Sequence, residues 1–417
     1  MKIQKNIKCI WSYITVFIKW MMISVMVGAL GGTLGSVFHI AIDAVTEFRL
    51  NHGIVILFLP LGGLAITGMY HAFASKGKID TNRVIESVRE NGKVPLIMVP
   101  LIFLSTIITH GLGGSAGREG AALQLGGGIG YNIGKILKLK EKGSRIIVMA
   151  GMSSVFAALF GTPLTAAIFS LEVTCVGTFH YLGLLPCVIA AIIAYSISQM
   201  FGITPVRFVG VLFESLSPEL AIKVIVLSLF CALVGILFCT TLHKCEYYLA
   251  KGVKNRYVRT VIGAVLVILL TMVVGAQDYN GTGMDIVANA ISGTAKPEAF
   301  LLKILFTSIT ISAGFKGGEI VPAFFIGSTF GCAVSGLLGI NPGFAAAIGF
   351  VALFCSVVNC PLASIFLALE VFGTEGILFF AITCAVSYMM SGNYGLYHSQ
   401  EIVFSKLDDE EVHIKTK

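Results

Sequence analysis

The sequence predicts an all-α integral membrane protein, and three observations lead to this fold class. Of the 417 residues, 56% are hydrophobic and only 12% are charged, whereas a soluble chain carries about 25% charged residues. The mean hydropathy is +0.89. Apolar runs recur from Ile10 almost to the C-terminus. We therefore expect one large transmembrane domain over residues 1–417, not a leader followed by a soluble domain.

The charge distribution predicts the orientation of the chain. The net charge of +7 is modest and lies in short segments between apolar runs, which excludes nucleic acid as an expected partner and points to the lipid bilayer. Lys2, Lys5 and Lys8 precede the first apolar run, and basic residues recur over 135–145. Because cytoplasmic segments are enriched in Lys and Arg, we expect a multi-pass cell-membrane protein with a cytoplasmic N-terminus. The tail, 398–417, is expected to be cytoplasmic and solvated around its acidic residues 408–411.

Apolar runs and helix-breaking residues together predict the order of the elements. A short amphipathic helix is expected within 76–93, with Asp80-Thr81-Asn82 as its N-cap. The run over 146–173 is expected to break into two short helices at Gly161 and Pro163. A basic loop is expected over 244–259, and a polar loop with one short helix over 276–297. The expected apolar segments are 10 onward, 53–74, 94–110, 119–134, 181–200, 218 onward, 299 onward and the last spans before 391–397.

The ten cysteines are expected to be small buried hydrophobes. They are scattered through apolar segments and form no C-x-x-C pair, so neither a metal site nor a disulfide framework is predicted. We expect no cofactor.

One glycine-rich stretch is the strongest functional feature, namely Gly113-Gly114-Ser115-Ala116-Gly117-Arg118-Glu119-Gly120-Ala121-Ala122. Such a break at membrane depth leaves backbone N–H groups that lipid cannot satisfy, and an anion can satisfy them. A helix that starts near Glu119 would point its amides and positive dipole end at that anion. The Glu119 carboxylate would compete for the same place. A carboxylate in a membrane helix costs about 2.5–3.5 kcal/mol on insertion scales, so a functional role is expected.

An internal repeat indicates that the chain has two halves. A shift of 198 residues aligns 151–173 with 349–371, including Pro163 with Pro361 and Glu172 with Glu370. At almost the same shift, Ser115-Ala116-Gly117 matches Ser312-Ala313-Gly314. Interrupted hydrophobic segments at corresponding places in two halves indicate a transporter's binding site. We place the half-repeats at about 10–203 and 218–397. Sequence alone leaves their relative orientation open.

With these motifs, the chain resembles the CLC family of chloride channels and anion/proton antiporters. The family's G-K/R-E-G-P motif stands here as Gly117-Arg118-Glu119-Gly120-Ala121, with Ala in place of Pro, and its G-x-F-x-P motif as Gly318-Glu319-Ile320-Val321-Pro322. Tyr397 matches a pore tyrosine, and Pro100 falls at the family's spacing before the glutamate. The regulatory CBS domains that some members carry are not expected.

The resemblance implies an inverted-repeat, many-helix homodimer with one pathway per subunit. It implies that Glu119 is the gate and proton carrier. The anion would be held by the amides of Glu319 and Ile320 and by the Tyr397 hydroxyl. Arg118 and Gly120, which flank Glu119, are also expected to bind the anion, as is Thr81.

Two departures from the family pattern affect the expected site. The usual G-S-G-I-P motif is replaced by Asp80-Thr81-Asn82, so Thr81 becomes the nearest candidate for the anion-contacting hydroxyl, although it could serve only as an N-cap. Many antiporters have Glu-Glu where this chain has Glu172-Val173. Glu319 instead lies in the second break, as in the family's fluoride/proton branch, and is expected to transfer protons. That branch has Met at the place of Thr81 and Thr at that of Val321, so the match is partial.

The remaining candidates are expected to be structural. Glu172 and Glu370 end equivalent short helices, which favours a cap or a loop anchor. His110 precedes the first break, and a packed, hydrogen-bonded histidine is favoured there over a proton relay.

The predicted function is transport of a halide, chloride or fluoride, in exchange for protons, and the alternative is a passive anion channel on the same fold. An intramembrane enzyme is disfavoured because the chain has no H-E-x-x-H motif and no convincing partner for a nucleophilic serine. A cation transporter would be expected to gather several acids and exposed carbonyls at helix C-termini instead of glycine-rich helix starts.

Overall fold

The computed structural model describes residues 2–73, 79–90, 92–408 and 410–417, with side chains from residue 10 onward. The first half of the described chain contains α1 (Lys2–Asn51), the 3-10 helix η1 (Gly53–Phe58), α2 (Leu59–Phe73), α3 (Thr81–Glu90), α4 (Met98–Gly111), α5 (Glu119–Ile136), α6 (Glu141–Phe160), α7 (Pro163–Glu172), strand β1 (Cys175–Val176), η2 (Tyr181–Gly183) and α8 (Leu184–Met200). The second half contains α9 (Pro218–Gly252), α10 (Arg256–Val274), α11 (Met284–Ile291), α12 (Ala299–Ser312), α13 (Ile320–Leu338), α14 (Pro342–Val358), α15 (Pro361–Phe372), α16 (Ile377–Met390), β2 (Glu401–Phe404) and β3 (Glu411–Lys415).

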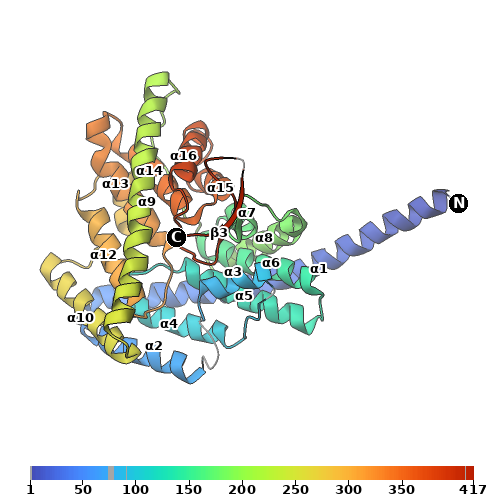
Figure 1. Ribbon diagram of the computed structural model, residues 1–417, viewed down its shortest axis with the longest axis horizontal. Coiled ribbons are helices and arrows are strands. Elements are labelled where there is room, and N and C mark those ends of the chain that lie inside the picture. The colour runs from blue at the N-terminus through green and yellow to red at the C-terminus, as the bar shows by residue number, and fades with distance from the viewer. Residues whose placement is uncertain (1, 74–78, 91, 409) are drawn as a thin grey trace.

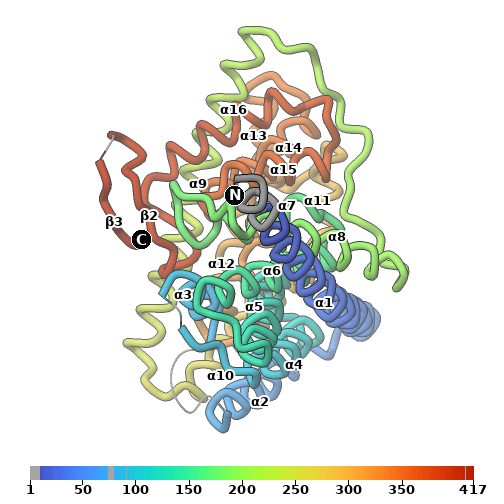
Figure 2. Tube along the Cα trace, turned by 90° about the vertical axis from the view of Figure 1, so that its right-hand side faces the viewer, coloured from blue at the N-terminus to red at the C-terminus, as the bar shows by residue number. Residues whose placement is uncertain are grey.

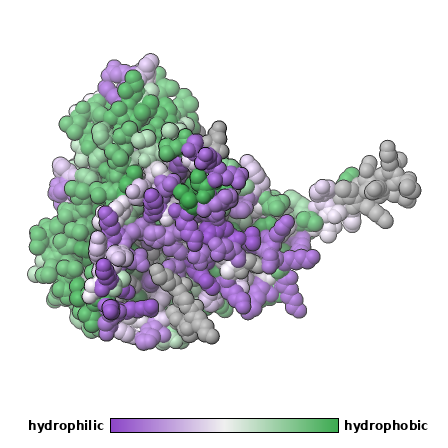
Figure 3. Space-filling view, in the orientation of Figure 1, coloured by the Kyte–Doolittle hydropathy of each residue, from purple (hydrophilic) through white to green (hydrophobic). Residues whose placement is uncertain are grey.

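The predicted all-helical membrane fold is confirmed. Seven helices in the described part of the chain are long and apolar enough to cross a membrane. The surface view shows broad hydrophobic areas along one side and the top, and a polar area over the centre of the face that carries α3 and β3 (Figure 3). Figure 1 shows α1 extending away from the body and the long α9 running across the second half.

Figure 2 shows α2–α6 below α13–α16. The two halves also interlock, because α10 lies beside α2 and α7 lies beside α15. In each half, the helix after the glycine-rich break packs closely on its successor. A Cβ added at Gly126 of α5 would lie 2.1 Å from the carbonyl oxygen of Gly151 in α6, and one at Gly327 of α13 would lie 2.1 Å from that of Gly349 in α14. Only glycine permits this approach of two backbones.

The repeat is confirmed, but one part of its predicted register is wrong. α7 and α15 begin at Pro163 and Pro361, as the shift of 198 requires. At the breaks, however, Gly117 pairs with Gly318, and the helices that follow begin at Glu119 and Ile320. A shift of 201 therefore relates the two breaks. It exceeds the shift of 198 at the other block by three residues, and the shift of 197 implied by matching 115–117 with 312–314 by four.

Most other predicted elements hold, and one predicted loop is wrong. α1 is continuous over 50 residues, longer than one membrane crossing. The expected basic loop over 244–259 is largely helical, because α9 continues to Gly252 and α10 begins at Arg256. The tail was expected to be solvated, and its residues 408, 410 and 411 are exposed. Its flanking segments nevertheless form β2 and β3, which join β1 in a sheet of order β1-β2-β3.

Two glutamates brace the halves against each other. Glu172, at the end of α7, accepts hydrogen bonds from the backbone amides of Leu362 (3.2 Å) and Ala363 (2.9 Å) at the start of α15. Glu370 in α15 accepts from the amides of Leu164 (2.9 Å) and Thr165 (2.8 Å), and from the Thr165 hydroxyl (2.6 Å), at the start of α7. Each carboxylate thus caps the helix start of the other half, where the dipole favours negative charge. The structural role predicted for this pair is confirmed.

This bracing makes a prediction about stability. Glu172→Ala should lower the melting temperature of the detergent-solubilised protein more than Glu370→Ala, because Glu172 is buried and Glu370 is partly exposed. Each buried donor left without an acceptor costs about 1–3 kcal/mol. The exposed Glu375 supplies the control, Glu375→Ala, which should leave the melting temperature unchanged. Equal melting temperatures for all three variants would contradict the capping role.

Candidate anion site

The two glycine-rich breaks meet in a short antiparallel bridge. The amide of Gly117 donates to the carbonyl of Gly318 at 2.6 Å, and the amide of Gly318 donates to the carbonyl of Gly117 at 2.7 Å. The preceding turns need Gly113 and Gly314, whose φ angles are +89° and +106°, a region that other residues rarely adopt. The bridge therefore brings the starts of α5 and α13 together from opposite halves.

Glu119 lies at this junction. It is the first residue of α5 and is completely buried. Its Oε2 accepts a hydrogen bond from the amide of Val321 at 3.1 Å, near the start of α13. Its Oε1 has no partner within the described residues. The carboxylate thus occupies a place where helix α13 presents its first amides, as expected for a group that competes with an anion.

Glu319 takes the place in the second half that Arg118 takes in the first. Arg118 is the N-cap of α5 and Glu319 the N-cap of α13. The Glu319 residue is partly exposed, and Glu119 is close enough for the two charges to interact. The Arg118 guanidinium instead pairs with Asp43 at 3.2 Å, so its side chain is engaged with α1. The structure therefore brings Glu119 and Glu319 together, while the Arg118 guanidinium is held by Asp43.

Two other predicted residues are buried. Tyr397 is buried, and its hydroxyl has no partner in the described part of the chain. Ile320 is the buried first residue of α13. A buried hydroxyl without a protein partner is rare, and it leaves Tyr397 able to donate to an anion.

Thr81 lies beside Gly120 and is already engaged by protein groups. Its hydroxyl is 3.3 Å from the carbonyl of Gly120, to which it donates, and it accepts from Nε2 of Gln124 at 3.1 Å. The N-cap bond of α3 is made by Asp80, whose Oδ1 accepts from the amide of Arg83 at 3.1 Å. Thr81 is therefore near the junction but is not the capping group.

Sequence reasoning missed the element that holds the Tyr397 loop. The Thr416 hydroxyl donates to the carbonyl of Tyr397 at 2.6 Å. The amide of Lys417 donates to the carbonyl of Asn393 at 2.7 Å, and that of Gly395 to the carbonyl of Lys417 at 3.3 Å. The tail thus returns after β3 and fixes the loop. The alternation of Val412 and Ile414 with charged residues was an available strand signal.

Sequence reasoning also missed two buried cations near the junction. Lys303 in α12 donates to the carbonyls of Tyr279 (3.1 Å) and Gly281 (2.7 Å). Arg49, at the end of α1, donates to the carbonyl of His110 at 3.3 Å. Both side chains are almost completely buried. Charged residues inside apolar helices were the available signal.

His110 connects Arg49 to the bridge. It is completely buried, and its Nε2 lies 3.1 Å from the carbonyl of Gly117. The packed, hydrogen-bonded role predicted for His110 is confirmed.

These features define a class of protein. Two helix starts meet at a glycine-rich break, two carboxylates and a hydroxyl without a protein partner lie beside it, and seven described helices can cross a membrane. Discontinuous helices that present their starts to an anionic substrate are typical of membrane transport proteins. The structure is therefore that of a broken-helix membrane transporter.

Comparison with known proteins identifies the family. Residues 62–392 match the family described as voltage gated chloride channel, and the chain belongs to this family, the CLC proteins. A chloride/fluoride channel protein of Pseudomonas syringae pv. tomato is 35% identical over 397 residues, which cover 93% of this chain and 87% of the relative. An H(+)/Cl(-) exchange transporter of Vibrio campbellii is 27% identical, with 84% of this chain and 81% of the relative covered.

Solved structures agree with this assignment. A crystal structure of a CLC-type fluoride/proton antiporter superposes with a TM-score of 0.88 at 32% identity, covering 92% of this chain and 97% of that one. A slow cyanobacterial Cl-/H+ antiporter has the same fold, with a TM-score of 0.76 at 20% identity, covering 89% of this chain and 94% of that one.

The bridge predicts a strong effect of one added methyl group. In Gly318→Ala, the new Cβ would lie 2.6 Å from the amide nitrogen of Gly120 and 2.8 Å from both the amide nitrogen and Oε2 of Glu119. The helix starts must then separate, and anion transport in liposomes should fall at least tenfold. Gly336→Ala on the same helix α13 is the control, because nothing lies within 4 Å of its Cβ. Normal transport in Gly318→Ala would show that the bridge is dispensable.

The tail makes a second, independent prediction. Thr416→Val removes the hydroxyl that fixes the Tyr397 carbonyl but keeps the size of the side chain. The Tyr397 loop loses one buried hydrogen bond, worth about 1 kcal/mol, so the apparent anion affinity should fall severalfold. Thr416→Ser retains the hydroxyl and should restore it. If anion titrations of both variants match the wild type, the tail does not position Tyr397.

Proposed function

We propose that this protein exchanges a halide for protons across the membrane, with Glu119 as gate and proton carrier. The observation that carries the proposal is the Glu119 carboxylate bound at the start of α13, where its Oε2 lies 3.1 Å from the Val321 amide. A deprotonated Glu119 fills an anion position, and a protonated Glu119 no longer competes for it. Alternate occupancy then couples the two movements. In this reading the chain is a transporter and not an enzyme.

Fluoride is the substrate favoured over chloride. The Pseudomonas relative is named for chloride and fluoride, and the antiporter structure at 32% identity is described as a fluoride/proton antiporter. Glu319 stands at the N-cap of α13, as in the branch that the sequence resembles. Fluoride is the smallest halide and the strongest hydrogen-bond acceptor, and the amides and hydroxyl of this site would replace part of its hydration.

The other site roles follow from this proposal. The amides of Glu319 and Ile320, the Tyr397 hydroxyl and the backbone near Gly120 would hold the anion, while Thr81 and Arg118 would shape its surroundings. Glu319 would pass protons between Glu119 and the inner side. The half-repeats at about 10–203 and 218–397, the homodimer and the cytoplasmic termini belong to the same proposal, because family members suggest them.

A passive anion channel on the same fold is the second candidate. The Pseudomonas relative is called a channel protein, which favours it. Against it stand two carboxylates near one another at the break, since a channel needs no second proton-transfer group beside its gate. A pH gradient separates the two, because only an exchanger uses it to move an anion uphill.

The test uses purified protein in liposomes, with fluoride and chloride gradients and a recording of internal pH. Glu119→Gln should keep anion flux and lose proton movement, because the amide cannot release a proton. Glu319→Gln should slow proton movement at least tenfold. Glu375→Gln, on an exposed loop, should behave as wild type. Full proton coupling in Glu119→Gln would remove the gate from the mechanism, and wild-type flux without any proton movement would establish the channel.

A further inference from the structure

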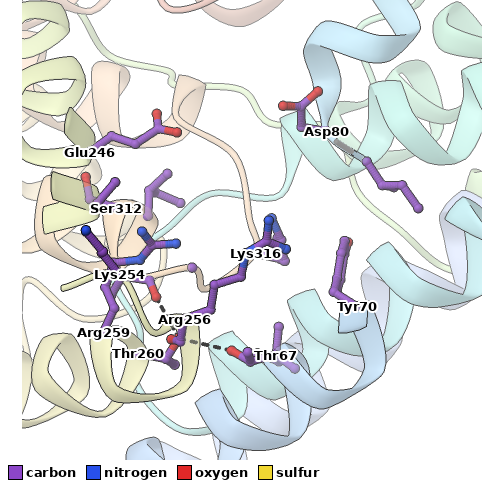
Figure 4. A pocket seen from close by; sticks show the side chains of 16 residues that line it. Thr67, Tyr70, Asp80, Glu246, Lys254, Arg256, Arg259, Thr260, Ser312 and Lys316 are labelled. Carbon is purple, nitrogen blue, oxygen red and sulfur yellow. Dashed lines mark hydrogen bonds between the residues drawn. The ribbon is translucent and has the colours of Figure 1, made fainter. Parts of the chain in front are cut away.

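A polar pocket of about 650 Å³ is lined by residues other than those assigned to the anion site. Its walls come from α2, residues Ile79 and Asp80 before α3, the end of α9, the start of α10 and the segment from the end of α12 to Lys316 (Figure 4). Pockets for organic ligands measure about 300–1,000 Å³. The volume therefore fits a molecule with several polar groups and is far larger than a single halide.

Among the described residues, cations outnumber acids in this pocket. Lys254, Arg256, Arg259 and Lys316 line it, against two carboxylates, Asp80 and Glu246. Figure 4 shows Lys316 in the middle, Lys254 and Arg259 together on one side and Asp80 on the far side. The Nε of Arg259 is buried and has no hydrogen-bond partner in the described residues. Buried polar groups are normally paired, so an unpaired guanidinium nitrogen in this cluster indicates an anionic ligand.

The cations, and not the helix start, would hold that ligand. The first amides of α10 are already satisfied, because the Asn255 side chain accepts from the amides of Tyr257 (2.9 Å) and Val258 (3.4 Å). The Lys316 ammonium lies 4.7 Å from the centre of the Tyr70 ring, a cation–π contact that places its charge in the pocket. Arginine forks combined with lysine point charges bind phosphate groups well.

The pocket borders the proposed anion path. Asp80 directly precedes Thr81, and Lys316 lies three residues before Glu319. Asp80 and Glu246 are both close enough to Glu319 for their charges to interact. A ligand held here would therefore lie against both segments that lead to the helix junction.

We propose that this pocket binds the phosphate group of a phosphorylated compound and that its occupancy slows transport. The phosphate could come from an anionic lipid headgroup, since basic pockets between membrane helices bind such headgroups, or from a soluble phosphate compound. Both sources share the chemistry that Arg259, Lys254 and Arg256 recognise. The binding does not depend on how protons and anions are coupled.

The experiment compares the double variant Lys254→Gln/Arg259→Gln with wild type and with Lys138→Gln/Lys142→Gln. The control removes the same charge from exposed lysines between α5 and the first turn of α6. Binding of inorganic pyrophosphate to the purified full-length protein is measured by calorimetry at constant ionic strength. Retention of phosphatidylglycerol is measured by native mass spectrometry after extraction from vesicles of phosphatidylcholine with phosphatidylglycerol.

Pyrophosphate affinity, lipid retention, or both should fall at least tenfold in the pocket variant and remain unchanged in the control. The arm that shows this loss identifies the source. The same probe should lower the transport rate of wild type severalfold and that of the pocket variant not at all. Should the double variant fail to fold, Lys254→Gln alone, at an exposed side chain, should weaken binding at least threefold. Equal binding in wild type, pocket variant and control, or no binding of either probe, would overturn the proposal.

Discussion

The fold depends on one contact, the pair of backbone hydrogen bonds between Gly117 and Gly318. Each bond satisfies an amide and a carbonyl that the breaks have removed from helical pairing, and lipid offers no substitute. The contact requires glycine, because a Cβ at Gly318 would collide with the start of α5. Once the bridge forms, the first amides of α5 and α13 must face a common place. An anion or a carboxylate there accepts their hydrogen bonds. The anion chemistry is thus a consequence of how two broken helices satisfy their backbones.

The charges around the bridge follow a similar rule. Arg49 and Lys303 are buried, yet they donate hydrogen bonds to the carbonyl oxygens of His110, Tyr279 and Gly281, and Arg118 pairs with Asp43. These cations raise the positive electrostatic potential near the helix starts but do not bind the anion directly. A directly bound cation would hold an anion too tightly for release, whereas amides and more distant charges favour its arrival and still permit its departure.

Most of the fold was predictable because helix breaks leave clear marks in the sequence. Pro163, Pro361 and the paired glycine runs fixed the short helices and the two halves, and Glu119 could be singled out because a carboxylate between apolar runs is costly. The repeat register at the second break could not be read correctly, since Ser-Ala-Gly recurs by composition and only the Gly117–Gly318 pairing distinguishes the alternatives. The cations Arg49 and Lys303, and the tail that holds Tyr397, depend on contacts between distant segments, which local patterns do not report.

Three glutamates near helix ends show how one residue type can be fixed or mobile. Glu370 accepts three hydrogen bonds and Glu172 accepts two, all from helix starts in the opposite half. Moving either carboxylate would leave several donors without an acceptor at once. Glu119 accepts a hydrogen bond across the junction from the Val321 amide, and its second oxygen is without a partner in the described chain. An arriving anion can restore the bond that Val321 loses when Glu119 leaves its place. The rigid pair keeps the halves in register, and this register is what allows Glu119 to move without disturbing the helices that it gates.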